Sequence, residues 1–379
     1  MRRILLFLSF LFFLYAGWTV LDKLDAKTDN QSVFDTITSE FDNVSKSEEL
    51  ANIKTKLNEG IQYITTLLQS LKEKAPENSM IDQNEIEKPE LNIPSEQAFS
   101  IHNVELGESK QSVETELGAS KRTSLNEYGT NWYTYHENYH NFMMIAYDSQ
   151  DHVVGLYTNQ DLISSTKGIK RGTPKQDALN LLGEPMTRIQ KGFVYYEFQQ
   201  DRDYDVFHID NTYVTLFYDK HENNTVTSVQ IVSEALEQKR ADFYTDASDQ
   251  LKVGFEYQLF DLTNASRVNH GLGILTWDEH VKETARKHSV DMAENNYFSH
   301  TNLQGQSPFD RMLEDEVLFT IAGENLAYGQ FSSVFAHEGL MNSMGHRENI
   351  LKKEYKFLGV GVAFNTESHP YYTENFYTK

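Results

Sequence analysis

Two histidines and one glutamate near the C-terminus are the residues of this 379-residue chain best suited to chemistry. His300, Glu324 and His346 each lie in a short run of polar and turn-forming residues, and a fourth such run covers residues 371–376. Imidazole and carboxylate groups held on short loops around one cleft can bind a cation or move a proton. A purely structural role, in which these side chains only bond to each other and fix the loops, is the third interpretation.

Three common catalytic signatures fail at the residues that come closest to them. His337-Glu338 begins like the zinc motif H-E-x-x-H, but Met341 occupies the second histidine position. Ser343 lacks the preceding glycine of a nucleophile elbow. The sequence also has no phosphate-binding glycine loop of the Walker type. No catalytic residue is therefore assigned from these motifs.

The composition excludes several classes of function. The chain has no cysteine, which rules out disulfides, a thiol nucleophile, a cysteine-ligated zinc site and a lipid-modified N-terminal cysteine. A formal net charge of −22 argues against nucleic acid as a partner, because such binding needs clustered Lys and Arg. The same charge repels anionic lipids and polymers unless divalent cations intervene. A hydrophobic content of 39% over this length supports two folded domains.

The N-terminus is typical of an export signal. Arg2 and Arg3 precede an uncharged apolar run over residues 4–21, which as a helix is about 27 Å long and just crosses a bilayer core. The run is longer than a usual cleaved signal and lacks a good small-residue cleavage site. Residues 1–21 are therefore interpreted as a signal anchor, with a cleaved signal peptide as the alternative. The protein would face outward from the cell membrane, or be secreted if the signal is cleaved.

Residues 22–99 form a predicted helical stalk and linker. Three prolines and many polar residues mark the linker between about 75 and 98. The helix is amphipathic and either packs on its own globular part or forms a short coiled coil. Its apolar positions recur every three or four residues: Leu50, Ile53, Leu57, Ile61, Ile64, Leu67, Leu68 and Leu71.

An internal repeat defines a domain over residues 100–240. The pattern around Gly107 recurs 65 residues later around Gly172, and Leu-Gly pairs at 117–118 and 182–183 follow at the same offset. Each copy is predicted to be a short helix, capped by Ser109 or Thr173, followed by a small antiparallel sheet. The expected strands cover residues 131–136, 142–147 and 153–157 in the first copy and 193–198, 213–218 and 226–232 in the second.

The C-terminal domain, residues 251–379, is predicted to combine helices with strands. A helical connector over 234–249 leads into it, and residues 297–328 appear as a long turn-rich stretch. Asp278 or Thr276 is expected to cap the second of its helices. The predicted helices cover 255–268, 278–295, 308–313 and 331–343, and the predicted strands cover 358–364 and 371–377.

Residues 255–379 resemble the CAP superfamily, also called SCP-like, which includes cysteine-rich secretory proteins, antigen 5 and plant pathogenesis-related proteins. Residues 100–240 more diffusely resemble the CAP-associated domain of some Firmicutes, so that the whole chain is similar to exported CAP proteins of the Bacillus type. The bacterial motifs occur in order: Leu275-Thr276-Trp277-Asp278, Tyr297-Phe298-Ser299-His300-Thr301, Ser307-Pro308-Phe309-Asp310-Arg311-Met312, Gly323-Glu324-Asn325-Leu326-Ala327, Gly345-His346-Arg347 and Gly359-Val360-Gly361-Val362.

The resemblance implies an α+β protein whose C-terminal domain is an α-β-α sandwich with a central cleft. That cleft carries two His and two Glu in the family, and His300, His346 and Glu324 match three of them. The position of the second Glu is Ser343 in this chain, with Glu338 one turn away as a substitute. Of the residues around this site, Asn325 is expected to brace the backbone. Arg347 is expected to pair with Glu348 or Glu354, with binding of a carboxylate ligand as the alternative. His288 is expected to lie in a helix, satisfied by a neighbour, with a position lining the cleft as the alternative.

The leading hypothesis is an exported, membrane-tethered protein that binds a ligand or a cation in this cleft at the cell surface. The ligand would be a cell-wall, lipid or protein component, and the cation would be zinc or another divalent ion. The first alternative is a metal-dependent hydrolase or protease in which His346 or Glu324 activates a water. The second is a structural or regulatory protein that acts through its repeat domain. The predicted cleft residues are His300, Glu324, His346, Asn325 and Ser343, of which His300, His346 and Glu324 are the metal candidates.

Overall fold

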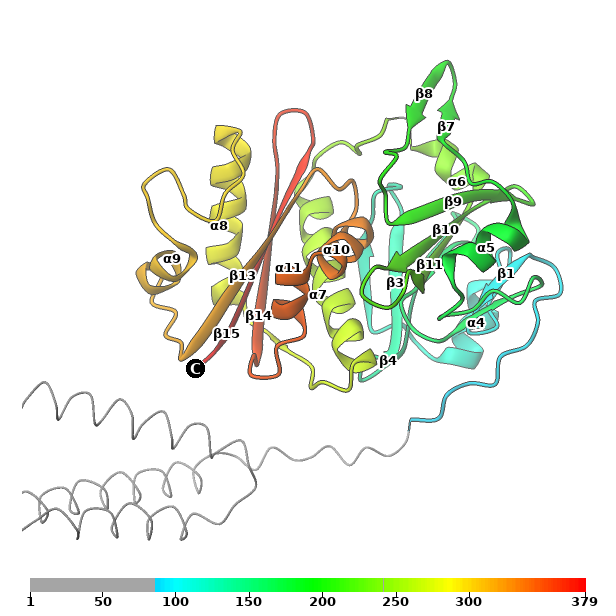
Figure 1. Ribbon diagram of the computed structural model, residues 1–379, viewed down its shortest axis with the longest axis horizontal. Coiled ribbons are helices and arrows are strands. Elements are labelled where there is room, and N and C mark those ends of the chain that lie inside the picture. The colour runs from blue at the N-terminus through cyan, green and yellow to red at the C-terminus, as the bar shows by residue number, and fades with distance from the viewer. Residues whose placement is uncertain (1–85, 241) are drawn as a thin grey trace, which may run out of the picture. The chain divides into compact units, whose positions relative to one another are not determined.

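Residues 86–240 and 242–379 are described by the computed structural model of the chain (Figure 1). The predicted signal anchor and residues 22–85 of the predicted stalk and linker lie outside the described residues. Within the described ranges, none of the helices is both long and apolar enough to cross a membrane.

The N-terminal domain is built on an antiparallel sheet with the strand order β2-β3-β4-β5-β11-β10-β9. Two short sheets, β1-β6 and β7-β8, accompany it. Its elements are β1 (Phe99–Ile101), α4 (Lys110–Leu117), β2 (Arg122–Leu125), β3 (Asn131–Glu137), β4 (His140–Tyr147), β5 (Val153–Thr158), β6 (Ile163–Ser165), α5 (Lys175–Leu182), β7 (Arg188–Lys191), β8 (Val194–Glu197), β9 (Tyr204–Ile209), β10 (Thr212–Asp219), β11 (Thr225–Ser233) and α6 (Glu234–Lys239).

The predicted repeat is confirmed, and its two sheets are joined into one. The strands β3-β4-β5 of the first copy are mirrored in order by β9-β10-β11 of the second, and the copies meet where β5 pairs antiparallel with β11. Gly107 and Gly172 occupy equivalent turns, with φ of 93° and 86°. Each glycine donates its N–H, at 2.8 Å, to a backbone carbonyl at the start of the last strand of its copy. The acceptors are Val153 in β5 for Gly107 and Val226 in β11 for Gly172. The positive φ explains why both turns contain glycine.

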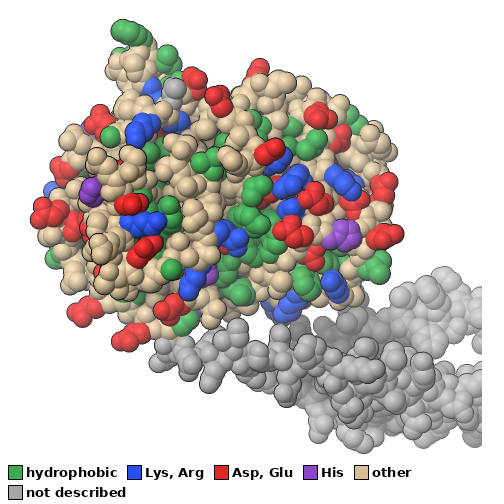
Figure 2. Space-filling view, turned by 180° about the vertical axis from the view of Figure 1, so that it is seen from behind, with side chains coloured by type: hydrophobic (Ala, Val, Ile, Leu, Met, Phe, Trp, Pro, Cys, Tyr) green, Lys and Arg blue, Asp and Glu red, His purple; other side chains and the backbone are tan. Residues whose placement is uncertain are grey.

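The second copy departs from the prediction in two places. Residues 193–198 were expected to be its first sheet strand, but β8 forms a separate hairpin with β7, and β9 takes that place. This hairpin projects from the domain, with Phe193 fully exposed at its apolar tip (Figures 1 and 2). Ser109 caps α4 as predicted, whereas Thr173 does not cap α5: Pro174 is the N-cap residue, and the Thr173 hydroxyl accepts from the N–H of Lys170.

The C-terminal domain is a three-layer α-β-α sandwich, which confirms the expected fold (Figure 1). Helices α8 and α9 cover one face of a sheet with the order β12-β14-β15-β13, and α7, α10 and α11 cover the other. Its elements are α7 (Asp249–Asn269), β12 (Thr276–Trp277), α8 (Glu279–Asn295), α9 (Pro308–Glu314), β13 (Ile321–Tyr328), α10 (Ser333–Asn342), α11 (Met344–Ile350), β14 (Phe357–Phe364) and β15 (Pro370–Thr378).

Two predictions for this half of the chain are wrong. The connector is not one helix over 234–249, because α6 ends at Lys239 and Arg240 adopts an extended conformation. Residues 321–328 are not turns but the strand β13, which pairs along its whole length with β15. Glu324 and Asn325 are adjacent buried polar residues on this strand, so its two faces do not alternate between apolar and polar.

Helix α7 joins the two domains into one packed unit. Fourteen of its 21 residues are buried, because it lies between the sheet of its own domain and the N-terminal sheet. Gly254 packs so tightly that a Cβ there would lie 2.1 Å from the carbonyl oxygen of Leu125. Asp261, also on α7, accepts hydrogen bonds of 2.9 Å from Arg122 Nε and from the Tyr139 hydroxyl. The apolar cores of the two domains merge along this helix.

Glu338 belongs to this domain interface and not to the His300 site. Its Oε1 accepts hydrogen bonds from the hydroxyls of Tyr157, at 2.6 Å, and Ser228, at 2.7 Å, both on the N-terminal sheet. The suggestion that Glu338 replaces the missing second glutamate of the cleft is therefore wrong. Burial raises the pKa of Glu338 from an ordinary 4.5 to about 7.

Replacing Glu338 with glutamine is expected to flatten the pH dependence of stability. Between the ordinary pKa and the raised one, the folded chain holds a proton that the unfolded chain has released, so the wild type loses stability as the pH rises through this window. From about pH 5 to about pH 8, we expect the free energy of unfolding of the wild type to fall by about 3 kcal/mol relative to Glu338→Gln. Urea unfolding of both proteins across this range measures the difference, and parallel curves would contradict the expectation.

Candidate functional site

His300 is held by a buried carboxylate on the central sheet. The imidazole lies in the loop between α8 and α9, and its Nδ1 is 2.9 Å from Oε1 of Glu324 on β13. The Glu324 side chain is 1% exposed, whereas that of His300 is 52% exposed. The Nδ1–H group donates to the carboxylate, so in the neutral ring Nε2 is left as a lone-pair acceptor. One edge of the ring is therefore fixed and the other is available to a ligand.

Arg311 completes this pair from helix α9. Its Nη2 lies 2.6 Å from Oε2 of Glu324, and its Nη1 donates to the carbonyl oxygens of His300, at 2.7 Å, and Gln306, at 3.1 Å. A capping box between Ser307 and Asp310 starts α9 and so fixes where Arg311 lies. This role of Arg311 was not predicted, although Arg311 lies in one of the family motifs of the sequence. The available signal was the helix-capping residue Ser307, seven residues after His300, with α9 beginning at the next residue.

His346 lies in the first turn of α11, directly after the corner that α10 and α11 form at Ser343. Its Nδ1 is 2.9 Å from Oγ of Ser343, the residue that ends one helix and begins the next. Burial lowers the pKa of His346, and the nearby His300 lowers it further. The His346 ring is therefore uncharged at neutral pH, and the two histidines lie close enough to repel each other when charged.

Asn325 connects these parts of the site. Its Nδ2 donates to the carbonyl oxygen of His346, at 3.1 Å, and to Oε2 of Glu374, at 3.0 Å. Asn349, one turn after His346, donates to Oδ1 of Asn325 at 2.9 Å and to the carbonyl of Glu324 at 3.2 Å. Glu374 is fully enclosed, and burial raises its pKa to about 7. No role was predicted for Glu374 or Asn349, because both act across strands and helices that are distant along the chain.

Of the side chains at this site, only the two imidazole groups have an atom left to bind a cation. Both carboxylate oxygens of Glu324 accept hydrogen bonds, one from His300 and one from Arg311, so Glu324 orients the histidine and is not itself a ligand. Within 86–240 and 242–379, no group of three or more His, Asp or Glu side chains is arranged to hold a metal ion. A cation at this site would be bound by the Nε2 atoms of His300 and His346, with water as the remaining ligands.

Two further expectations concern neighbouring residues. Arg347 pairs with neither Glu348 nor Glu354: its Nη1 lies 2.8 Å from Oδ2 of Asp219 in the N-terminal domain. That prediction was wrong because the partner comes from a part of the sheet 128 residues away. His288 is buried in α8, and its Nε2 bonds at 2.9 Å to the carbonyl of Ser299, close to His300.

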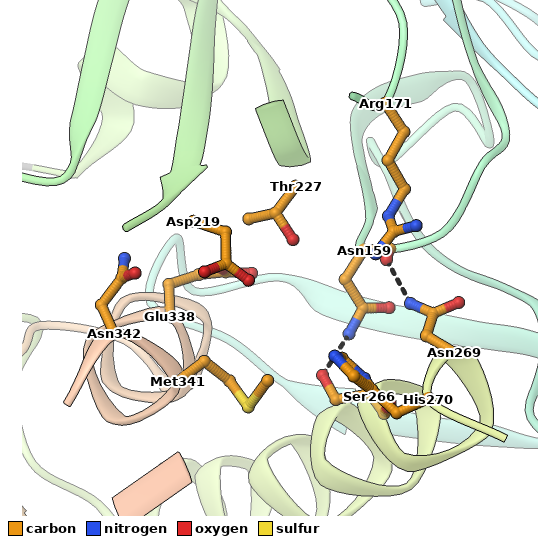
Figure 3. Close-up of a pocket in the computed structure, with 10 residues that line it drawn as sticks. All are labelled: Asn159, Arg171, Asp219, Thr227, Ser266, Asn269, His270, Glu338, Met341 and Asn342. Carbon is orange, nitrogen blue, oxygen red and sulfur yellow. Dashed lines mark hydrogen bonds between the residues drawn. The ribbon is translucent and has the colours of Figure 1, made fainter. Parts of the chain in front are cut away.

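A separate small cavity lies between the two domains and contains none of the predicted site residues (Figure 3). Its volume of about 10 Å³ is enough for one water molecule. The side chains around it are mostly polar, and Oδ1 of Asn159 is buried there without a hydrogen-bond partner. This cavity belongs to the domain interface, and the predicted cleft at His300 stays a prediction.

The three-layer sandwich is the fold expected of a CAP domain. Residues 260–376 match the model of the cysteine-rich secretory protein family, and residues 106–243 match that of the CAP-associated N-terminal domain. The chain belongs to the cysteine-rich secretory protein, or CAP, family in its bacterial form. The two domains are called the CAP-associated domain and the CAP domain from here on.

Two proteins of Bacillus subtilis are similar to this chain. YlbC, described as an uncharacterized membrane protein, is 31% identical over 290 residues, which cover 72% of this chain and 82% of YlbC. YkwD, described as uncharacterized, is 39% identical over 125 residues, which cover 33% of this chain and 48% of YkwD.

Solved structures with the same fold come from two other bacteria. An extracellular SCP-domain protein of Bacillus anthracis has a TM-score of 0.63 at 26% identity, over 78% of this chain and 100% of the other. A cysteine-rich secretory protein of Staphylococcus aureus has a TM-score of 0.59 at 15% identity, over 76% and 95% of the two chains. The second likeness concerns the fold alone.

Proposed function

We propose that this protein is a membrane-tethered receptor at the outer cell surface, and that its CAP domain binds a wall component through His300 and His346. One observation carries the proposal: each imidazole is fixed through Nδ1, by Glu324 and by Ser343, so that Nε2 of each ring remains to meet a ligand. Side chains held in this way by a buried network are preorganised for binding.

The surroundings of the two histidines favour an uncharged ligand that offers both hydroxyl groups and apolar surface. Exposed apolar side chains flank them in the sequence: Phe298 and Leu303 near His300, and Met344 near His346. The chain carries a net charge of −22. An anionic lipid would be repelled by that charge. The glycan strands of the cell wall match the site better.

The tether is inferred from the apolar run at residues 4–21. The name of YlbC, a membrane protein, and the description of the Bacillus anthracis protein as extracellular support this placement. A receptor anchored by its N-terminus would hold the CAP domain outside the membrane, within reach of the wall.

A metal-dependent hydrolase is the second candidate function. The observation in its favour is the hydrogen bond from His300 Nδ1 to Glu324, since a carboxylate in that position commonly orients an imidazole that binds metal through its other nitrogen. This candidate requires tight binding of Zn²⁺ to chelator-treated protein and hydrolysis of wall material that is lost in His300→Ala.

Sedimentation of the full chain with purified wall sacculi tests the receptor proposal. We expect His300→Ala and His346→Ala each to weaken binding about tenfold or more, the effect of losing roughly 1.4 kcal/mol of contact energy. His280→Ala removes an exposed histidine of α8 and serves as the matched control, with binding unchanged. Equal binding by all four proteins would contradict the proposal, and vesicles of anionic lipid in a parallel arm test the lipid alternative.

A further inference from the structure

The corner that carries His346 is tied to the CAP-associated domain by its neighbours on both sides. Arg347 follows His346, and its Nη1 bonds both to Asp219 Oδ2, at 2.8 Å, and to the carbonyl oxygen of Met341, at 3.2 Å. Asp219 is the last residue of β10, and both charged groups are largely buried. The guanidinium of Arg347 therefore bonds both to the end of α10, at Met341, and to Asp219 of the other domain.

Asn342 makes the second attachment, just before the corner. Its Oδ1 accepts from the N–H of Lys220 at 2.9 Å, and its Nδ2 donates to the carbonyl of Tyr218 at 2.8 Å. The side-chain amide thus pairs with the end of β10 as a neighbouring strand would. His221 adds a contact of 3.2 Å between its Nε2 and the backbone carbonyl of Asn342. Asp219, Met341 and Asn342 all border the interface cavity (Figure 3).

We infer that the β10–β11 turn of the CAP-associated domain positions His346, with Asp219 as the principal positioning residue. Ser343 and His346 lie between the two attachments, and the hydrogen bond between their side chains sets the direction of the imidazole. A buried ion pair constrains its surroundings more strongly than an exposed one, because a displaced charge loses a partner that water cannot fully replace. The CAP domain of this chain is therefore completed by its companion domain.

The inference deepens the proposed function, since it concerns one of the two ligand-binding histidines, but its test needs no ligand. Asp219→Asn in the full chain removes the charge and keeps the oxygen that accepts from the N–H of His221. Asp261→Asn is the matched control: the buried Asp261 forms an ion pair of 2.9 Å with the partly exposed Arg122 across the same domain interface, and this pair involves neither α10 nor α11. Both variants are expected to lower the melting temperature.

The two variants should differ at His346. We expect Asp219→Asn to shift the imidazole NMR signal of His346 and to speed amide hydrogen exchange over residues 344–350 about tenfold, whereas Asp261→Asn leaves both as in the wild type. Asn342→Ala, which removes the amide attachment without changing a charge, should shift the same signal. The inference is overturned if Asp219→Asn only lowers the melting temperature, or if both aspartate variants move His346 equally. Failure of wall binding would leave this result untouched.

Discussion

Replacing Gly361 with alanine is expected to destabilise the CAP domain by about 3 kcal/mol or more, the upper end for overpacking a core. A Cβ at this position of β14 would lie 2.0 Å from the backbone nitrogen of Arg286 and 2.4 Å from the carbonyl carbon of Ala285, both in α8. Backbone atoms inside a helix cannot turn aside as a side chain can. The whole helix would have to move away from the sheet, and with it the loop that carries His300. Urea unfolding measures the loss.

Gly339→Ala is the matched control for this substitution. Gly339 lies within α10, and a Cβ there meets no atom within 4 Å. Alanine loses less backbone entropy than glycine on entering a helix, so we expect a gain of about 0.5–1 kcal/mol. A Gly361→Ala protein as stable as the wild type would contradict the close contact between α8 and β14.

Replacing Arg311 with alanine should cost about 3–5 kcal/mol, because it leaves the carboxylate of Glu324 buried without its charged partner. The side chains of Glu324 and Arg311 are only 1% and 9% exposed, so water does not readily replace the guanidinium. The substitution also frees the carbonyl oxygens of His300 and Gln306 that Arg311 holds. We therefore expect wall binding to fall along with stability. Denaturant unfolding and sedimentation measure the two effects.

A double-mutant cycle separates the charge from the packing of Arg311. In Glu324→Gln the buried group carries no charge, so removing Arg311 from that background should cost clearly less than removing it from the wild type. A coupling energy of about 1.5 kcal/mol or more is expected. Equal costs in the two backgrounds would mean that Arg311 acts through packing alone.

Local signals in the sequence were enough to predict four of the CAP-domain helices, α7 to α10, whereas the short helix α11 (Met344–Ile350) was not predicted. Asp278 caps α8 as expected, by accepting from the N–H groups of His280 and Val281. The capping residues before α9 and the two apolar C-terminal strands likewise define their elements within a few neighbouring residues. The glycines at 107 and 172 revealed the repeat, because their turns need a positive φ.

The features that were missed depend on partners that are distant in the sequence. Strand β13 is recognisable only from its pairing with β15, since Glu324 and Asn325 mask its alternation. Asp219 and Arg347 are an ion pair that no local pattern could suggest. The family resemblance placed His300, Glu324 and His346 in one site, but not Arg311, whose role depends on the packing of α9 against β13.

Binding of a wall ligand by His300 and His346 can be followed directly by titrating the full chain with a soluble fragment of wall glycan and recording the NMR signals of its histidine side chains. We expect the imidazole signals of His300 and His346 to shift together and saturate, while that of His280 stays in place. We expect the same response after chelator treatment, because the ligand itself meets the two Nε2 atoms. Signals of His300 and His346 that remain unmoved by saturating glycan would contradict the proposed binding site.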